Sequence, residues 1–166
     1  MEILRSPLSD DDLLRLSARL ALKGSQLEYV RGKVVVSPPT GGQTGNRNFN
    51  LYGPLAEFAN RHGYVGYDSS TGFRLSDGDV RSPDAALIAQ QRVARLTPQE
   101  RKQFPPPVPD IVVELLSETD DLAELVEKCE RWRDEGSSFV VLLDPQMERR
   151  LTWGEAPEGF PELTAW

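Results

Sequence analysis

Apolar positions at helical spacing occur in three segments of the chain. Residues 9–22 place leucine at every third or fourth position, and Ser9 stands where a helix N-cap is expected. A second apolar stripe covers residues 49–62, after the glycine-rich residues 40–48, which predict turns. The third and most regular stripe covers residues 120–136 and ends at a glycine. The pattern therefore predicts three helices.

Shorter apolar runs between turn signals predict strands. Residues 27–36 predict a hairpin that turns at an Arg-Gly pair, and residues 64–89 predict a meander of three strands. Residues 111–116 and 139–143 are apolar runs of the kind that forms strands buried on both faces. Because a helix is predicted between these two runs, we expect a right-handed parallel crossover, followed by an edge strand at residues 149–153.

Length and composition are typical of one globular domain. The 166 residues are 39% hydrophobic and 27% charged, which is enough to bury a core. The order of strands and helices predicts an α/β (α+β) fold, a mixed β-sheet flanked by helices in a single domain over residues 1–166. Within it we expect an N-terminal helix at residues 9–22, a core over residues 27–145, and a C-terminal edge strand and tail at residues 146–166.

Neither a membrane span nor a secretory signal is expected. No apolar run approaches the roughly 20 residues that cross a bilayer, and the N-terminal segment is acidic and lacks the basic start of a signal peptide. Cys129 is the single cysteine, which excludes an intramolecular disulfide, and its place on the apolar side of a predicted helix favours a buried thiol. These features predict a cytoplasmic protein.

The charge balance is acidic. Twenty-six acidic and 19 basic residues give a net charge of −7, which opposes unspecific binding to nucleic acid because that binding depends on lysine and arginine neutralising phosphates. A local basic patch is still compatible with this balance. The candidates for such a basic rim are Arg74, Arg81, Arg92 and Arg95.

Three charged residues stand in or beside apolar segments. Glu114 lies inside the apolar run 111–116, where an acid needs a partner. Asp84 precedes another apolar strand, and Lys128 lies on the flank of the third helical stripe, from which its ammonium can reach back toward the sheet. We therefore expect the three residues to converge. The partner of Glu114 is then Lys128, a metal ion, or both.

Two carboxylates from neighbouring strands form a hard oxygen site suited to Mg²⁺ or Mn²⁺. Such an ion could activate water, and a nearby lysine could stabilise charge on a phosphate and orient or deprotonate the attacking water. A buried ion pair between Glu114 and Lys128 with a purely structural role explains the same residues. The residue types alone leave both interpretations open.

Three segments resemble the PD-(D/E)XK nuclease superfamily, in its restriction-endonuclease-like branch of Uma-type endonucleases: SPDAALI, VVELLS and EKCERWRDEGSSFVVLLDP. With LEYVRGKVVVSPP, the resemblance covers roughly residues 27–145. It implies that Asp84 is the Pro-Asp acid, Glu114 the second acid and Lys128 the lysine, moved from the strand to the following helix. Leu116 stands two residues after the second acid, where strict members of the superfamily carry the lysine.

The resemblance also implies roles for residues earlier in the chain. Glu28 matches a further acid, which could belong to the metal shell or hold the attacking water, or could be an exposed strand residue without a role in the site. Relatives carry a histidine after the Ser-Pro segment, where this chain offers Gln43 or Thr44. We expect a Mg²⁺- or Mn²⁺-dependent endonuclease that hydrolyses DNA phosphodiester bonds by metal-activated water. The residues expected to be catalytic are Glu28, Asp84, Glu114 and Lys128, of which Asp84 and Glu114 hold the metal.

Two other functions fit the same residues. A catalytically inactive nuclease fold could serve as a module that binds protein or nucleic acid, since Leu116 and the absent histidine depart from the family pattern. A metal-dependent hydrolase of a non-nucleic phosphate ester is the other. Exposed sheet edges and the tryptophan at the C-terminus favour a homodimer. Asp110 is expected to be an exposed residue at the start of a strand and not a ligand.

Overall fold

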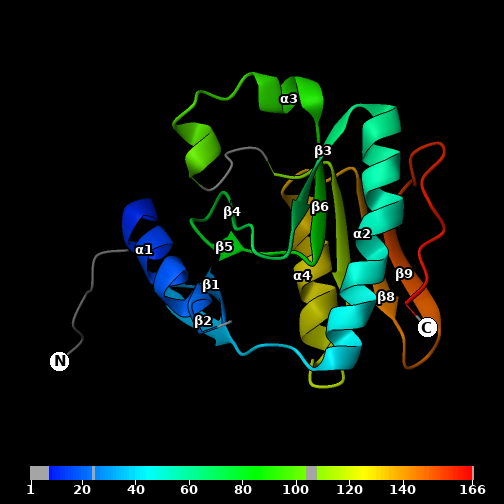
Figure 1. Cartoon of the computed structure of the whole chain (residues 1–166), viewed down its shortest axis with the longest axis horizontal. Coiled ribbons are helices and arrows are strands. Elements are labelled where there is room, and N and C mark those ends of the chain that lie inside the picture. The colour runs from blue at the N-terminus through cyan, green and yellow to red at the C-terminus, as the bar shows by residue number, and fades with distance from the viewer. Residues whose placement is uncertain (1–7, 24, 104–107, 166) are drawn as a thin grey trace.

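In the computed structural model, which describes residues 8–23, 25–103 and 108–165, the strands form two sheets (Figure 1). The larger sheet contains, in spatial order, β3 (Tyr64–Asp68), β6 (Ala85–Ala89), β7 (Ile111–Leu115), β8 (Phe139–Asp144) and β9 (Arg149–Gly154). The smaller sheet contains, in spatial order, β2 (Lys33–Ser37), β1 (Gln26–Val30), β5 (Val80–Arg81) and β4 (Phe73–Arg74). The helices are α1 (Asp10–Ala21), α2 (Gly42–His62), α3 (Gln90–Ala94) and α4 (Leu122–Asp134), with a 3-10 turn at Glu100–Lys102.

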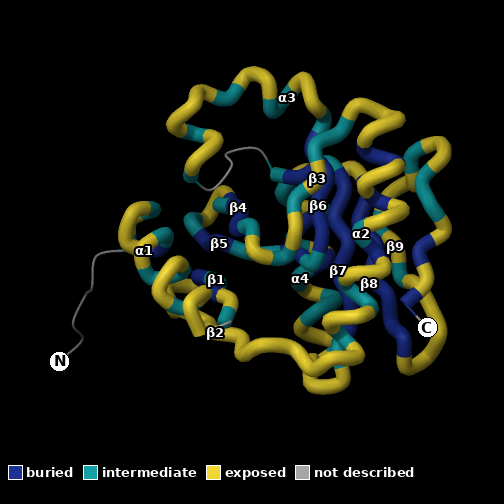
Figure 2. The backbone as a smooth tube through the Cα atoms, in the orientation of Figure 1, coloured by how far each residue is buried: buried dark blue, intermediate teal, exposed yellow. Residues whose placement is uncertain are grey.

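The larger sheet is mixed, as the sequence predicts. β7 and β8 pair in parallel and are connected through α4, whereas the other neighbouring strands pair antiparallel, and β9 forms an edge. Helix α2 packs on one face of this sheet and α4 on the other, so the central strands are buried on both sides (Figure 2). This double burial explains why β7, apart from Glu114, and β8, as far as Asp144, are apolar. The predicted fold class, a single domain with a mixed sheet flanked by helices, is confirmed.

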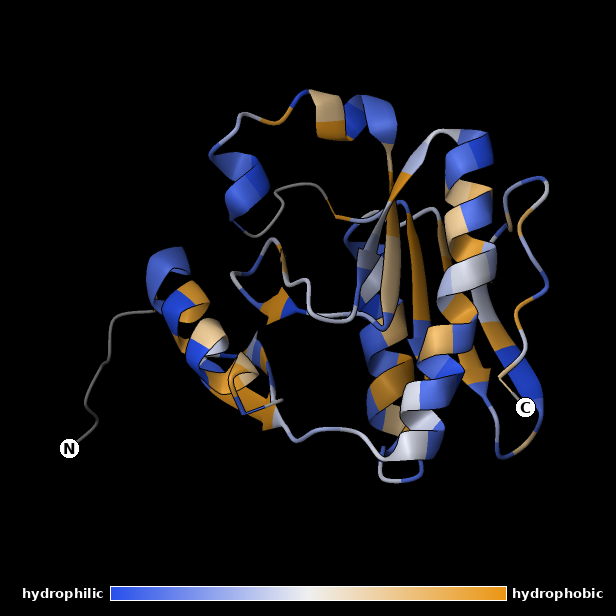
Figure 3. Cartoon of the chain, viewed as in Figure 1, coloured by the Kyte–Doolittle hydropathy of each residue, from blue (hydrophilic) through white to orange (hydrophobic). Residues whose placement is uncertain are grey.

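The smaller sheet has a separate apolar core against α1. Leu13 of α1 packs with Leu27, Tyr29 and Val80 of the sheet, and the other face of the helix is polar (Figure 3). The predicted N-cap is confirmed, because the Ser9 hydroxyl accepts a hydrogen bond from the Asp12 backbone N–H at 3.2 Å. Figure 1 shows α1 and this sheet on one side of the molecule, with the larger sheet, α2 and α4 on the other.

The predicted meander over residues 64–89 is wrong. β3 pairs with β6 in the larger sheet, whereas β4 and β5 pair with each other, and β5 also joins β1 in the smaller sheet. The cause is visible in the packing, since Phe73 enters the core under α4 while Val80 enters the core under α1. Local apolar patterning indicates strands here but does not indicate which sheet receives them.

The turns predicted for residues 40–48 are also wrong, because α2 begins at Gly42. Glycine lowers helix stability by roughly 1 kcal/mol relative to alanine. The later turns of α2 offset this cost by burying Leu51, Leu55 and Phe58 against the sheet. Within the described ranges, no helix combines the length and apolarity needed to cross a membrane.

Candidate active site

Asp84 and Glu114 lie on neighbouring strands. The antiparallel register of β6 and β7 pairs Ala85 with Val113, and one step further along the same register brings Asp84 opposite Glu114. Glu114 belongs to the face of the sheet that α4 covers, since Val112 packs on that side and side chains alternate along a strand. The sheet therefore places the two predicted metal ligands side by side.

Glu114 is buried, with 1% of its surface exposed, and it has two partners. Lys128 Nζ lies 3.1 Å from its Oε1 and 3.3 Å from its Oε2. Trp132 Nε1 donates a second hydrogen bond to Oε1 at 2.9 Å. The sequence predicts Lys128 as a partner, but it indicates Trp132 only as an apolar core residue. The spacing of Lys128 and Trp132 on one helix, four residues apart, is the signal that could have identified both as partners.

Lys128 connects three segments of the chain. Its ammonium donates to the Ser82 carbonyl oxygen at 2.7 Å and lies 3.1 Å from Glu28 Oε1, in addition to its contacts with Glu114. Its side chain is only 14% exposed. Helix α4 thus brings one cation to acids from both sheets.

Glu28 belongs to this cluster and is not an exposed strand residue. Its Oε1 accepts a hydrogen bond from the Ser82 backbone N–H at 2.7 Å, and Arg81 Nη1 lies 3.6 Å from its Oε2. Ser82 therefore contacts Glu28 through its N–H and Lys128 through its carbonyl oxygen. Ser82, which precedes the Pro-Asp pair, therefore contributes its backbone N–H and carbonyl groups to the site, and the sequence analysis did not identify it.

Asp84 is oriented by two groups. Its Oδ2 accepts a hydrogen bond from the Leu115 backbone N–H at 2.7 Å, and Asn48 Nδ2 lies 3.4 Å from its Oδ1. The structure therefore brings all four predicted residues into one region: Glu28, Glu114 and Lys128 in direct contact, and Asp84 on the strand beside Glu114.

Acid is in excess over base in this cluster. Burial raises the pKa of Glu114 to about 7, with the charge of Lys128 opposing the rise and that of Asp84 adding to it. Burial also raises the pKa of Asp84. For Glu28, burial is outweighed by Lys128 and by the Ser82 N–H, so the Glu28 pKa is lowered. Burial alone would lower the pKa of Lys128, but Glu114, Glu28 and Asp84 together raise it.

This cluster fits a hard divalent cation. Burial is the main cause of the raised pKa values of Asp84 and Glu114 and makes their ionised forms unfavourable, and a cation beside them would stabilise these forms. Across residues 8–23, 25–103 and 108–165, no three histidine, cysteine or acidic side chains form a complete metal cage. An ion held by the two carboxylates would take further ligands from other oxygens, as Mg²⁺ does when it retains water.

We expect Glu114→Gln to remove a pH-dependent loss of stability in metal-free protein. Between about pH 4.5 and 7 the unfolded chain releases the Glu114 proton while the folded protein keeps it, so the free energy of unfolding falls as pH rises. At 1.36 kcal/mol per pKa unit, the loss is roughly 3 kcal/mol. Urea unfolding at pH 5 and pH 8 in EDTA measures it.

The control for this experiment is Glu130→Gln, which changes an exposed acid on the same helix as Lys128. In the Glu114→Gln variant, the amide oxygen of the new side chain can still accept from Trp132. An equal pH dependence for the parent and the Glu114→Gln variant would show that Glu114 is ionised throughout this pH range.

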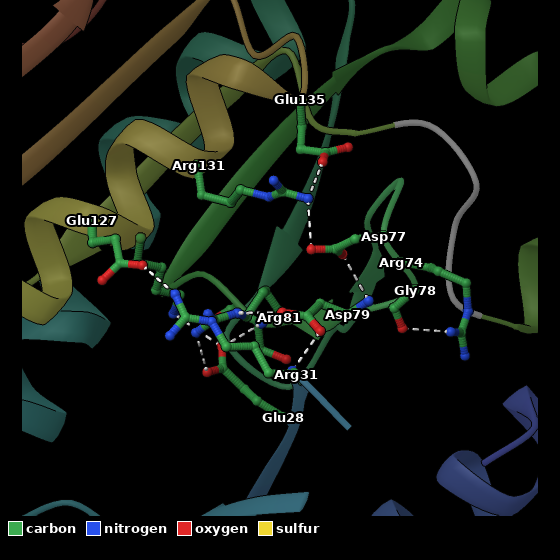
Figure 4. Close-up of polar contacts among 12 residues, drawn as sticks. Glu28, Arg31, Arg74, Asp77, Gly78, Asp79, Arg81, Glu127, Arg131 and Glu135 are labelled. Atoms are coloured by element: carbon green, nitrogen blue, oxygen red, sulfur yellow. Dashed lines mark hydrogen bonds and ion pairs between the residues drawn. The ribbon is translucent and has the colours of Figure 1, made fainter. Parts of the chain in front are cut away.

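A network of polar contacts holds the smaller sheet on α4 (Figure 4). Arg131 Nη2 lies 2.8 Å from Asp77 Oδ2 and 2.6 Å from Glu135 Oε1. Glu135 also accepts hydrogen bonds from the backbone N–H and the hydroxyl of Ser76, at 2.9 and 2.7 Å. Because Glu28 belongs to the smaller sheet and Lys128 to α4, these contacts stabilise the relative position of two site residues.

The predicted basic rim is mostly neutralised. Arg81 lies beside Glu28, Arg92 pairs with Asp110, and Arg74 pairs with Asp10. Arg95 is exposed. These ion pairs reduce the positive charge that the rim can offer to a polyanion.

Two further sequence expectations concern residues near the strands. The prediction for Asp110 is wrong in its exposure: the residue precedes β7 but is half-buried, accepts from the Ala89 N–H at 2.7 Å and pairs with Arg92. Cys129 is buried, as predicted. Gln43 and Thr44 lie in the first turn of α2, and the α2 side chain that contacts the Asp84 carboxylate is Asn48, one turn later.

Two comparisons relate the chain to known proteins. The Uma2 family model, described as "Putative restriction endonuclease", matches residues 10–164. A solved structure described as a "putative nuclease belonging to DUF820", from Anabaena variabilis ATCC 29413, has a TM-score of 0.68 at 16% sequence identity and covers 92% of this chain and 82% of that one. The structural likeness shows a shared fold. No curated protein matches the chain.

Proposed function

The chain belongs to the Uma2 family, and from that premise we propose that it is a metal-dependent endonuclease that hydrolyses DNA phosphodiester bonds. The proposal rests on one observation: a buried lysine contacts two acids from different sheets beside a third acid whose pKa is raised. Family membership confirms the resemblance predicted from the sequence. The metal dependence, the substrate and the residue roles are parts of the proposal.

Asp84 and Glu114 are the residues that would hold the cation. Bound Mg²⁺ or Mn²⁺ would supply an activated water and neutralise charge on a phosphate. Lys128 keeps its proton, because its pKa is raised by the surrounding acids. Its role is therefore to stabilise negative charge or orient water as a cation, and not to act as a base. Glu28 keeps the ammonium positioned through the 3.1 Å contact.

DNA is the proposed substrate on the strength of the family. The net charge of −7 and the ion pairs of the arginine rim make weak, salt-sensitive binding the expected behaviour. The homodimer predicted from the sequence remains a proposal. β2 is an edge strand of the smaller sheet, with β1 as its neighbour among the described residues, and its Val34, Val35 and Val36 are 37–46% exposed. The last residue, Trp166, lies outside the described residues.

A nuclease fold without catalysis is the second candidate. It is favoured by the completeness of the bonds around Glu114, since Lys128 and Trp132 already satisfy a buried carboxylate without any ion. A protein of this kind has no use for a metal. Its melting temperature would be the same with Mg²⁺, with Mn²⁺ and in EDTA.

The experiment that tests the proposal measures metal binding and substrate class together. The melting temperature of purified protein is recorded with and without Mg²⁺ or Mn²⁺, and hydrolysis is assayed on supercoiled plasmid and on bis(p-nitrophenyl) phosphate. The proposal expects a metal-dependent rise in melting temperature and cleavage of DNA. Hydrolysis of the small ester alone would favour a non-nucleic phosphate substrate, and neither activity nor metal stabilisation would favour the inactive module.

A further inference from the structure

Helix α2 reaches the site at two points one turn apart. The Tyr52 hydroxyl donates to the Asp84 carbonyl oxygen at 3.1 Å and accepts from the Ser69 N–H at 3.3 Å. One turn earlier, Asn48 Nδ2 lies 3.4 Å from Asp84 Oδ1. The first contact fixes the backbone of Asp84, so the second places the Asn48 amide beside the carboxylate proposed to bind metal.

The amide oxygen of Asn48 is buried and has no hydrogen-bond partner among the described residues. Leaving a buried acceptor unsatisfied costs about 1–3 kcal/mol. The hydrogen bond made by its Nδ2, at 3.4 Å, is also longer than the usual 2.9–3.0 Å, so it compensates poorly. An asparagine at this place is therefore not explained by its contacts with the protein.

If the Asn48 amide group rotates by about 180°, its oxygen takes nearly the position that its nitrogen held, and its nitrogen takes that of the oxygen. After that rotation, the Asn48 oxygen and Asp84 Oδ1 would face each other at about the separation now seen for the nitrogen. Two acceptors this close repel unless a cation lies between them, and carboxylate and carbonyl oxygens are the ligands that Mg²⁺ and Mn²⁺ prefer.

We propose that Asn48 is a protein ligand of the divalent cation held by Asp84 and Glu114, through its amide oxygen. This inference deepens the proposed function and rests on it. It explains how a site without a third acidic, histidine or cysteine ligand among the described residues gains another protein oxygen. In metal-free protein, the Asn48 amide nitrogen donates a long hydrogen bond to Asp84. With metal bound, the Asn48 amide oxygen would have the cation as its partner.

The competing interpretation makes Asn48 only a donor to Asp84. The two interpretations differ in whether an atom of residue 48 touches the ion. If Asn48 is a ligand, its loss weakens metal binding. If it is only a donor that orients Asp84, its loss also weakens metal binding, so a substitution that places a different ligand atom at this position is needed to separate them.

Isothermal titration of DNA-free protein with Mn²⁺ tests this, with the melting temperature in Mn²⁺ and in EDTA as a second readout. We expect Asn48→Ala to raise the Kd for Mn²⁺ roughly 10- to 100-fold and to reduce the metal-dependent rise in melting temperature. Asn48→Cys should give the Cd²⁺-loaded protein a thiolate-to-metal charge-transfer absorption that the parent lacks, which a residue that only orients Asp84 cannot produce. Asn50→Ala is the matched control, because Asn50 is an exposed residue of the same helix and its described side-chain bond is to Asn46.

Unchanged or tighter Mn²⁺ binding by Asn48→Ala, or no new Cd²⁺ absorption in Asn48→Cys, would overturn this inference and leave the proposed function standing. Absence of Mn²⁺ binding by the parent would instead overturn the proposed function, and this inference with it. If Asn48→Ala fails to fold, Asn48→Cys decides: a Cd²⁺-dependent thiolate absorption that the parent lacks supports a ligand at this position, and its absence contradicts it.

Discussion

Replacing Lys128 by methionine should lower the free energy of unfolding at pH 8, in EDTA, by about 3–5 kcal/mol, the usual cost of removing one partner of a buried ion pair. Lys128 is the cation that contacts both Glu114 and Glu28, and methionine keeps most of its length without its charge. Among the described residues, Glu114 would then retain Trp132 as its donor. In the variant, the buried carboxylates of Glu114 and Glu28 therefore lack the positive charge of Lys128. Urea unfolding measures the resulting fall in the free energy of unfolding.

The loss should shrink at pH 5.5. The pKa of Glu114 is raised to about 7 and that of Asp84 is also raised, so both acids bind protons more readily in the folded protein than in the unfolded chain. Removing the lysine charge raises these pKa values further, and protonation then relieves the repulsion. Lys102→Met changes an exposed lysine and is the control. A pH-independent loss below about 1 kcal/mol would contradict a buried, charge-compensating role for Lys128.

Replacing Asp84 by asparagine should lower the rate of metal-dependent DNA cleavage by roughly 10²- to 10⁴-fold. A catalytic metal contributes several kcal/mol to transition-state stabilisation, and each 1.36 kcal/mol corresponds to a factor of ten. The carboxylate of Asp84 is one of the two acids proposed to hold that metal. Cleavage of plasmid DNA in Mn²⁺ measures the rate, with Asp134→Asn, an exposed position on α4, as the matched control.

The same substitution should leave the metal-free fold intact. Burial makes the ionised form of Asp84 unfavourable, as its raised pKa shows, and asparagine is neutral. Its amide oxygen can still accept from the Leu115 N–H. A melting temperature in EDTA equal to or above that of the parent would therefore accompany the loss of cleavage. Full activity in this variant would remove Asp84 from the proposed mechanism.

Glu114 and Lys128 could be predicted as site residues because their charges stand in or beside apolar segments that are expected to be buried. Glu114 stands in an otherwise apolar buried strand, and Lys128 follows on the next helix at a position that reaches the same face. Burial forces such charges to be paired, so their convergence follows from sequence spacing and sheet geometry. The parallel crossover through α4 was predictable from the same burial, since both of its strands are apolar apart from Glu114 and Asp144.

The rest of the site depends on contacts that no local pattern specifies. Asn48 reaches Asp84 from a helix whose first turn reads as a turn-rich segment, and Glu28 meets Lys128 only because the smaller sheet packs against α4. That packing rests on Arg131, Asp77 and Glu135, which are ordinary surface charges in the sequence. The position of the smaller sheet against α4 therefore depends on long-range packing of β4 and β5, each of which is two residues long.

We propose that the cluster of Asp84, Glu114 and Lys128 hydrolyses DNA with a divalent cation. The measurement that tests it most directly is the rate at which the purified parent protein converts supercoiled plasmid to nicked plasmid in Mn²⁺ or Mg²⁺, beside the same protein in EDTA and the folded Asp84→Asn variant in metal. We expect the parent to nick the plasmid only when metal is present. Equal nicking by the parent and the Asp84→Asn variant, or no nicking by a parent whose melting temperature is unaffected by metal, would contradict it.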